Sequence, residues 1–514
     1  MDLNTGEYML KKINSGLILV FVLALLLRML GIQYGFPFIF HPDEPTIVRS
    51  ALGIFFDKNP GHFDWPHLYI YVNYFMYFLF VKFRDSSHTV GLSRIVFSWL
   101  PILGDGSLSF YFLSRVLTAF IGALTVIPVY LSSKKLFNIK AGILSALIFA
   151  ILPMHVVQSH YALPDIPMVF LLAWVVYFSI CIFYATTLKD YILGGLLIGF
   201  AASAKYNGGL SALGFFLAHV TKSFWQKFTN LKSTGYLFLA GALSILAFLI
   251  GTPYALFDYK TFSRTDGPKG ALWQFTNVGS REFPDHIQNF FRDMSERLII
   301  DLGYTVLIGF LIYLGIVLYR ILKKKSTQRD FGLLFLYITS LVFVYIVSGA
   351  IDSRSHYYLI IYPYVAIITG CFLEECLQFF DKKYKYISLL LFVFFLIPPF
   401  YASSIASMEF ANQDTRNLAF NYLKANLPNT AYLVYFDADF SAVANAVSAK
   451  TYKGLDKISK NNCGYIVLYF DSEEYLARKL WLENSVHFID LQEITRIDPV
   501  NRRGPGIVIF KYAL

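Results

Sequence analysis

Two adjacent carboxylates, Asp43 and Glu44, follow the first long apolar run of this sequence and precede a segment with helical periodicity. An ionisable side chain at the edge of a membrane is costly unless it is paired or used in function. A carboxylate at such a place can take a proton from a hydroxyl group whose oxygen attacks a substrate. Asp43 and Glu44 are therefore the first candidates for catalytic residues, with Asp43 as the general base.

Cations that could face a phosphate occur at the ends of later apolar runs. Lys205 lies in a tight turn between two such runs, and Arg354 precedes another. Both side chains neutralise phosphate, and arginine can do so through two parallel hydrogen bonds. A carboxylate base and such cations together suit nucleophilic displacement at a sugar carbon with a lipid phosphate leaving. Further ionisable residues expected at or near this face are Arg115, His155, His160, Asp165 and His356.

The composition indicates a protein that crosses the membrane many times. Of its 514 residues, 56% are hydrophobic and only 15% are charged, whereas soluble domains carry about 25% charged residues. The apolar residues also come in long blocks. The net charge of +10 does not point to nucleic acid, because lysine and arginine collect in the cytoplasmic loops of membrane proteins. The four cysteines show no metal-binding spacing.

Loop charge selects a topology of eleven spans. With this choice the lysine-rich loops all face the cytoplasm together with the N-terminus. The same choice places the candidate residues and the C-terminus outside the plasma membrane. The expected spans are about 14–32, 108–131, 141–157, 166–185, 191–204, 207–220, 235–250, 298–319, 331–349, 357–378 and 386–402.

The first outer loop, residues 33–107, is expected to carry helices that lie on the membrane surface. Residues 44–57 have apolar side chains at helical spacing, and Pro45 suits the first turn. Residues 66–83 could either span the bilayer or lie at its interface, where their tyrosines belong. Loop charge favours the interface, because Lys134 and Lys135 then fall inside.

A second long outer loop covers residues 251–297, with a turn-rich part and an aromatic segment typical of an interfacial helix. Residues 1–402 therefore form the expected catalytic membrane domain. From residue 403 onward, helical and strand patterns alternate, with strands expected near 431–436, 465–470 and 506–512 and helices at 414–423 and 472–484. This pattern predicts a small extracytoplasmic α/β domain at 403–514.

Several segments taken together resemble the GT-C glycosyltransferases that use polyprenyl-phosphate sugars, such as protein O-mannosyltransferases and aminoarabinose transferases. The resemblance covers most of residues 14–402, and it rests on the order and spacing of the motifs rather than on any one of them. The matching segments are His41 to Glu44, Trp65 to Tyr71, Leu113 to Val126, Leu152 to Asp165, Gly199 to Asn207 and Arg354 to Pro363.

The resemblance implies that Asp43 is the catalytic base and that Asp165 supports the site. It also implies that Lys205 and Arg354 with His356 face the donor phosphate. One departure stands out, because the aminoarabinose transferases carry a Lys-Pro-Pro run where this chain has Asp64 to Pro66. The substrate-binding candidates on the matching segments are Lys205, Arg354, His356, Tyr357, His41, His160 and Arg115.

Several candidates have a structural alternative. Asp165 could mark the start of a helix, with Pro167 in its first turn. Asp43 could simply cap the helix at Pro45, Arg354 could form a solvated pair with Asp352, and Lys205 could extend toward the interface from a helix end. Arg115 is best explained as a structural bridge to a carboxylate near the site. Histidines and a carboxylate could hold a divalent ion, but no spacing is diagnostic, so no cofactor is required and a metal is only compatible with the pattern.

The sequence thus predicts an integral membrane glycosyltransferase that moves a sugar from a polyprenyl-phosphate carrier to a protein, lipid or glycan hydroxyl, with inversion. The alternative is a transporter or flippase of lipid-linked sugars, which would favour midplane charges and inverted repeats. Neither is visible in the sequence. An Asp-x-Asp at Asp437 and Asp439 resembles a nucleotide-sugar motif, but a turn after a strand explains it.

Overall fold

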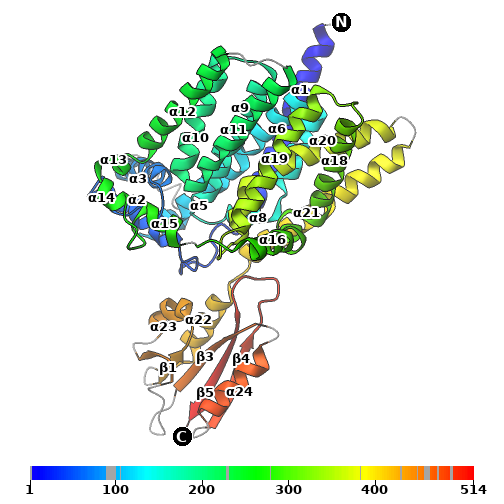
Figure 1. Cartoon of the computed structure of the whole chain (residues 1–514). Helices are drawn as coiled ribbons and strands as arrows, with labels where there is room; N and C mark the ends of the chain where they lie inside the picture. The colour runs from blue at the N-terminus through cyan, green and yellow to red at the C-terminus, as the bar shows by residue number, and fades with distance from the viewer. Residues whose placement is uncertain are drawn as a thin grey trace. The chain divides into compact units, whose positions relative to one another are not determined.

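The computed structural model describes residues 3–87, 100–104, 106–226, 231–277, 279–381, 384–428, 431–447, 450–455, 464–471, 474–486 and 490–513 (Figure 1). The chain divides into two units. The first unit, here called the membrane unit, comprises Met1–Met29 and Asp43–Ser404. The second, the C-terminal unit, comprises Leu30–Pro42 and Ile405–Leu514, so it includes residues that the sequence analysis assigned to the first outer loop.

Helices make up the membrane unit throughout its described residues. Its longer helices are α1 (Leu3–Met29), α3 (Leu68–Ser87), α5 (Leu108–Leu124), α6 (Val126–Leu136), α7 (Ile139–Ala150), α9 (Asp165–Tyr184), α10 (Leu188–Ala204), α11 (Ser211–Gln226), α12 (Leu231–Gly251), α18 (Tyr304–Leu322), α19 (Gln328–Ser348), α20 (Tyr362–Asp381) and α21 (Lys385–Ala411). Its shorter ones are α2 (Glu44–Gly53), α8 (Pro153–Gln158), α13 (Tyr254–Phe257), α14 (Tyr259–Phe262), α15 (Ala271–Asn277), α16 (Phe283–Arg292) and α17 (Leu298–Leu302).

Seven helical stretches among the described residues are long and apolar enough to cross a membrane. Two shorter apolar helices, Ser15–Met29 and Ile139–Ala150, coincide with two further expected spans. The remaining two expected spans fall on α10 and α11, which belong neither to the seven long stretches nor to the two shorter apolar helices. A multi-pass membrane protein is therefore confirmed, whereas the count of eleven and the orientation of the ends stay predictions. The seven stretches are Leu108–Leu136, Asp165–Tyr184, Leu231–Gly251, Tyr304–Leu322, Gln328–Ser348, Ser355–Phe380 and Lys385–Asn426.

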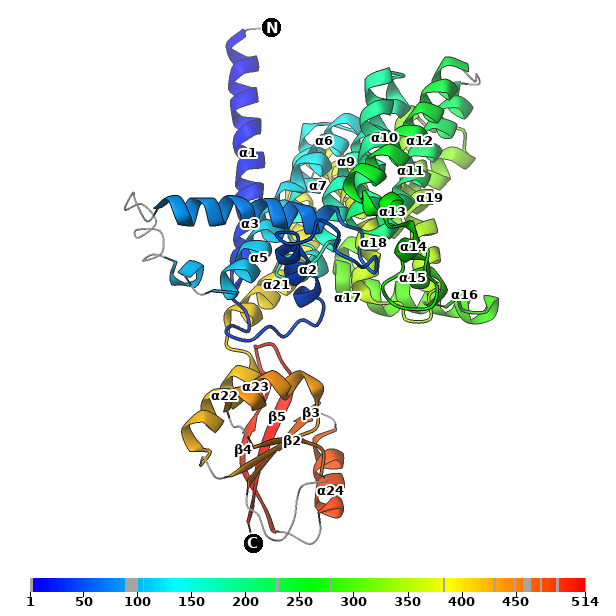
Figure 2. The same cartoon turned by 90° about the vertical axis from the view of Figure 1, so that its left-hand side faces the viewer.

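Helix α3 covers the segment for which the sequence left two alternatives open. It is not among the seven stretches, because it mixes tyrosine, asparagine and charged side chains with its apolar residues. In Figure 2 it runs crosswise to α1, which belongs to the same unit. A helix at the interface would run in this direction, and the surface placement of the first outer loop stays a prediction.

Glycines let α10 pack closely against α12. This packing fixes the position of the C-terminal end of α10, which Lys205 directly follows. A Cβ atom added at Gly199 would lie 2.0 Å from the Ser244 carbonyl oxygen, and one at Gly195 would lie 2.4 Å from that of Ala240. Small residues four apart let two membrane helices approach backbone to backbone. A larger side chain at either glycine would push the two helices apart and move Lys205.

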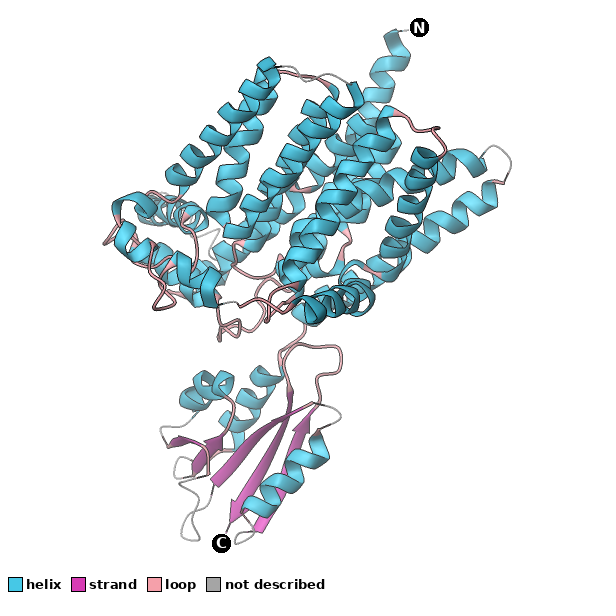
Figure 3. Ribbon diagram, viewed as in Figure 1, coloured by secondary structure: helices cyan, strands magenta, loops and turns pink. Residues whose placement is uncertain are grey.

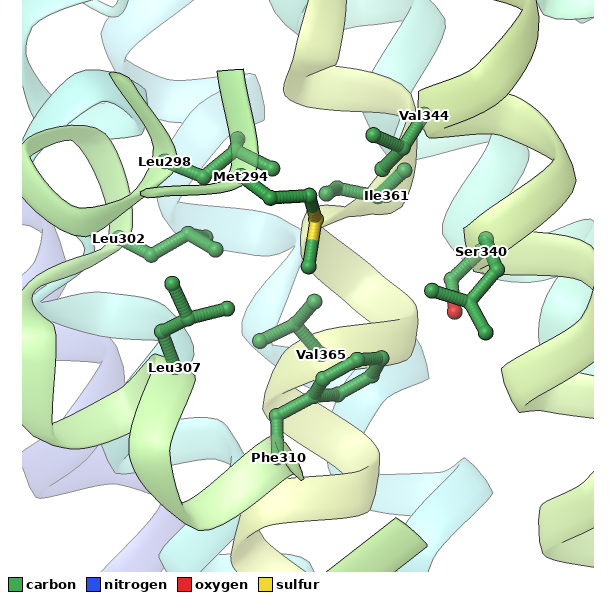
Figure 4. Close-up of a pocket in the computed structure, with 10 residues that line it drawn as sticks. Met294, Leu298, Leu302, Leu307, Phe310, Ser340, Val344, Ile361 and Val365 are labelled. Atoms are coloured by element: carbon green, nitrogen blue, oxygen red, sulfur yellow. The ribbon is translucent and has the colours of Figure 1, made fainter. Parts of the chain in front are cut away.

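Figure 4 shows a small pocket between α17, α18, α19 and α20. Met294 and Phe310 point into it, and Ser340 supplies the single polar side chain of its lining. None of the lining residues is ionisable, so this pocket cannot hold the acid and base chemistry that the sequence predicts. The lining residues are Met294, Leu298, Leu302, Leu307, Phe310, Ser340, Leu341, Val344, Ile361 and Val365.

The C-terminal unit contains a five-stranded mixed sheet in the order β2-β1-β3-β5-β4, coloured magenta in Figure 3. Helices α22 (Thr415–Asn426) and α23 (Ser441–Val447) pack on one face, and α24 (Tyr475–Ser485) packs on the other. Alternate residues of β3 enter the two apolar cores, as a central strand requires. The strands are β1 (Tyr432–Tyr435), β2 (Thr451–Lys453), β3 (Gly464–Phe470), β4 (Asp490–Ile497) and β5 (Gly506–Ala513).

The three expected strands correspond to β1, β3 and β5, and the two expected helices correspond to α22 and α24. Asp414 caps α22 by accepting a hydrogen bond from the Arg416 backbone N–H. The sequence analysis missed β2 and β4. These strands lie at the two edges of the sheet, where polar side chains face solvent and the apolar signal is weak.

Candidate functional site

Helix α2 begins at Glu44, and Asp43 occupies the position before it. The Asp43 side chain makes no capping hydrogen bond, and it is half-buried. The capping interpretation therefore does not account for Asp43. Glu44, by contrast, is fully buried and forms a bidentate salt bridge with Arg115 of α5. Its Oε1 lies 2.8 Å from Arg115 Nε, and its Oε2 lies 2.7 Å from Nη2.

Glu44 also accepts a hydrogen bond of 2.8 Å from the backbone N–H of Ala162. It thereby links α2 to α5 and to the loop that leads into α9, where Asp165 is the first residue. Glu44 was predicted as catalytic and Arg115 as substrate-binding. With no exposed surface on either side chain, both are placed to hold the backbone around Asp43, as the bridging interpretation of Arg115 expects.

Asp165 and Lys205 form the second ion pair of the site. Their atoms Oδ1 and Nζ lie 2.6 Å apart, and Asp165 is almost completely buried. The Lys205 ammonium also lies 5.3 Å from the ring centre of Trp65 and 5.2 Å from that of Tyr357. Two aromatic faces and one carboxylate thus fix the position of the ammonium group.

The charge of Asp43 acts on residues that surround Lys205. The charges of Asp43 and Asp165 both act on Tyr357, whose ring faces Lys205. The Asp352 carboxylate raises the pKa of the Arg354 guanidinium, and the Asp43 charge adds to that shift. Asp43, Asp165, Lys205, Tyr357 and Arg354 therefore belong to one region of the membrane unit, although they come from separate parts of the chain.

The remaining predicted residues occupy different surroundings. Arg354 pairs with exposed Asp352 at 2.7 Å, which is the solvated pair that the sequence analysis considered. His356 lies edge-on to Tyr357 with ring centres 4.5 Å apart. His160 is buried, and its Nδ1 contacts the Val156 carbonyl oxygen. His41 belongs to the C-terminal unit and precedes Asp43 by two positions.

No three histidine, cysteine, aspartate or glutamate side chains within the described ranges are grouped so that they could hold a metal ion. His155, which was a candidate for such a role, instead contacts Arg28 with 2.9 Å between Nδ1 and Nη2. Arg28 is fully buried in α1 and also donates to the Ala24 and Ala150 carbonyl oxygens. Sequence reasoning missed Arg28, although a cation inside an apolar run is the appropriate signal.

A buried network holds the segment that carries His356 and Tyr357. Tyr358, their neighbour in the 3-10 helix η4 (Ser355–Ile361), donates its hydroxyl to Asp293. Asp293 begins the π-helical turn η3 (Asp293–Arg297) and also accepts from Asn289 at 3.2 Å. The sequence analysis did not single out Asp293, because its partners are scattered along the chain.

A hydrogen-bonded chain also joins Ser50, His62 and Asp64 in the first outer loop. The Ser50 Oγ lies 2.7 Å from His62 Nε2, and His62 Nδ1 contacts Asp64. Asp64 directly precedes Trp65, whose ring lies near Lys205. These hydrogen bonds therefore fix α2 and the turn at Trp65 relative to each other.

Residues 96–250 match the family described as dolichyl-phosphate-mannose-protein mannosyltransferase. The chain is also similar to the dolichyl-phosphate-mannose–protein mannosyltransferase 1 of Saccharomyces cerevisiae, with 31% identity over 153 residues. That similarity covers 29% of this chain and 19% of the yeast protein, so it spans about a fifth of the relative. The family match over residues 96–250 includes Arg115, Asp165 and Lys205.

Two solved membrane proteins share the fold. The apo structure of ArnT from Cupriavidus metallidurans is 14% identical with a TM-score of 0.51, covering 99% of this chain and 98% of that one. The oligosaccharyltransferase AglB from Archaeoglobus fulgidus, bound to an inhibitory peptide and a dolichol-phosphate, is 13% identical with a TM-score of 0.51, covering 98% and 74%. Another structure of this archaeal enzyme holds Zn and sulfate.

The similarity covers nearly the whole chain in the structural comparisons and residues 96–250 in the sequence comparison. The resemblance to the GT-C glycosyltransferases is thus confirmed, and the chain has their fold together with a segment that matches the dolichyl-phosphate-mannose-protein mannosyltransferases.

Proposed function

We propose that this protein transfers a sugar from a polyprenyl-phosphate carrier to an acceptor hydroxyl at the outer face of the membrane. The observation that carries the proposal is the neighbourhood of Asp43, a half-buried carboxylate that does not cap its helix and whose charge acts on Arg354 and Tyr357. The relatives support the same class of donor, because AglB was solved with a dolichol-phosphate.

In the proposed reaction Asp43 takes the proton of the acceptor hydroxyl as that oxygen attacks the anomeric carbon. The bond from this carbon to the phosphate oxygen breaks, and the lipid phosphate leaves with the electron pair. A phosphate is stable as an anion, so this leaving group requires no general acid. A single displacement inverts the configuration at the carbon.

Lys205 is the proposed phosphate contact. Its ammonium group has three hydrogen-bond donors, and Asp165 engages one of them. The pair with Asp165 and the flanking rings of Trp65 and Tyr357 orient the others toward the donor phosphate. Arg354 adds a second positive charge, for which the phosphate competes with the exposed Asp352.

The proposal places the N-terminus in the cytoplasm and the C-terminal unit outside the plasma membrane. The acceptor is a protein, lipid or glycan hydroxyl, and no nucleic acid takes part. The reaction as written requires no cofactor, and a divalent ion would act only in addition, by neutralising charge on the phosphate.

Mass spectrometry of cells with and without the protein tests the proposal. Deletion should cause one polyprenyl-phosphate sugar to accumulate and one envelope glycan to disappear. Wild-type protein and the exposed control Lys260→Gln should restore the glycan, whereas Lys205→Gln should weaken donor binding about 10- to 100-fold and restore little. If the lipid-linked sugars are unchanged by deletion, the proposed donor class is wrong.

A further inference from the structure

Trp65 lies in the first outer loop, and its side chain is half-buried. Its ring centre lies 5.3 Å from the Lys205 ammonium nitrogen, which is the proposed contact of the donor phosphate. In the proposed function the ring serves only to orient that ammonium group. The indole also presents apolar surface that this role leaves unused.

Hydrogen bonds hold the turn around Trp65, here called the Trp65 turn (residues 62–67), against the segment that carries Lys205. Tyr206, the residue after Lys205, donates its hydroxyl to the Phe63 carbonyl oxygen at 2.8 Å. Phe63 is fully buried, and its backbone N–H donates to the Lys269 carbonyl oxygen at 2.6 Å. The Trp65 turn and Lys205 therefore keep a fixed spacing.

The last residue of the Trp65 turn is fixed as well. His67 is fully buried, and its backbone N–H donates to the Thr252 hydroxyl at 3.2 Å. Its ring stacks on that of Phe63 with ring centres 4.6 Å apart. Thr252 also shares a hydrogen bond of 2.7 Å with Ser203, which lies near the end of α10. The backbone at Trp65 thus cannot move away from the end of α10 without breaking buried hydrogen bonds.

The same turn is tied to α2, the helix that begins directly after Asp43. Ser50 of α2 contacts His62, and His62 contacts Asp64. The Asp64 carboxylate also accepts a hydrogen bond of 3.1 Å from the Trp65 backbone N–H. All of these residues belong to the membrane unit. A wall that is fixed before a ligand arrives loses little conformational freedom when the ligand binds.

The chemistry of the proposed donor indicates what the indole surface could bind. The sugar is joined to the phosphate through one bridging oxygen, so it lies directly beside the group that Lys205 contacts. The C–H groups on one face of a sugar ring are apolar, and an aromatic ring can cover them. The ring centre of Tyr357 lies 5.2 Å from the same ammonium nitrogen. Two aromatic side chains from separate elements therefore border the position next to the phosphate.

We propose that Trp65 binds the donor sugar, with its indole face packed on the sugar ring while Lys205 holds the phosphate. Trp65 thereby lets the enzyme distinguish the loaded carrier from the bare polyprenyl phosphate that remains after transfer. The two lipids share the phosphate and the tail, so only a contact to the sugar can separate them. Once the sugar has left, the loss of this contact favours release of the spent carrier.

The inference rests on the proposed function, and binding of two lipids to the full-length protein in nanodiscs tests it. The probes are dolichyl-phosphate mannose, chosen from the family match, and bare dolichyl phosphate. Wild type should bind the mannose lipid about 10-fold more tightly. Trp65→Leu should abolish this preference and change the affinity for the bare lipid no more than about 5-fold, the value of one cation–π contact. Equal affinity of wild type for the two lipids would overturn the sugar contact.

Two further variants separate the inference from the proposed function. Trp273→Leu is the matched control, at a half-buried tryptophan of α15, and it should leave both affinities unchanged. Lys205→Gln should weaken both lipids by the same factor, because it removes a phosphate contact. If Trp65→Leu also weakens both lipids equally, Trp65 acts only through Lys205 and the inference is wrong. If Lys205→Gln changes neither affinity, the proposed phosphate contact is wrong instead.

Trp65→Phe covers the case in which Trp65→Leu does not fold. Phenylalanine keeps an aromatic face of smaller area, so the preference for the mannose lipid should fall about 3-fold. The affinity for bare dolichyl phosphate should stay at the wild-type value, since a ring still faces Lys205. An unchanged preference in the folded Trp65→Phe protein would contradict the proposal.

Discussion

Asp43→Asn is expected to lower kcat about 10²- to 10⁴-fold while the affinity for the lipid-linked donor stays unchanged. Asparagine has the size of aspartate but cannot accept a proton at neutral pH. The donor phosphate is bound by Lys205 and Arg354 in the proposed reaction, so its affinity should not depend on the base. Single-turnover transfer by purified protein in nanodiscs, together with donor binding, measures both quantities.

Asp57→Asn is the matched control for this experiment. Asp57 is an exposed carboxylate in the same outer loop that accepts a hydrogen bond from the Asn59 backbone, and its replacement should leave kcat unaltered. A flippase would be little affected by either change. Asp43→Asn protein that still transfers sugar at the wild-type rate would therefore remove Asp43 as the base.

Breaking the buried pair between Glu44 and Arg115 should have the largest effect on stability. Both side chains are fully buried, so removing one partner leaves an uncompensated charge. Arg115→Met and Glu44→Gln are each expected to lower the free energy of unfolding by about 3–5 kcal/mol. Thermal unfolding in detergent measures the loss, and the N–H of Ala162 also loses a charged acceptor in the second variant.

The double variant makes this prediction specific. Replacing both partners removes the isolated charge, so the combined loss should be clearly smaller than the sum of the two single losses. Asp352→Asn provides the contrast, because its pair with Arg354 is exposed on both sides and should contribute less than about 1 kcal/mol. Additive losses in the double variant would show that the two side chains do not depend on each other.

Local patterns predicted much of the architecture. Apolar runs of sufficient length located every expected span on a helix, and Asp414 was correctly expected near the start of α22. The central strand β3 is buried at all seven positions and therefore has a continuous apolar signal. The edge strand β4 has only three apolar residues among its eight positions, so its signal was too weak to recognise.

The sequence by itself determined the membrane class, the two kinds of domain and the residue types of the proposed site, because hydropathy and charge act over short stretches of chain. Only the tertiary structure showed that Glu44, unlike Asp43, is held in a buried ion pair, since its partner Arg115 lies 71 residues away. It also decided that Arg28 is buried against His155 and that Arg416 donates a hydrogen bond to the Tyr34 hydroxyl. These contacts join distant residues, and no local periodicity records which buried charge will meet which partner.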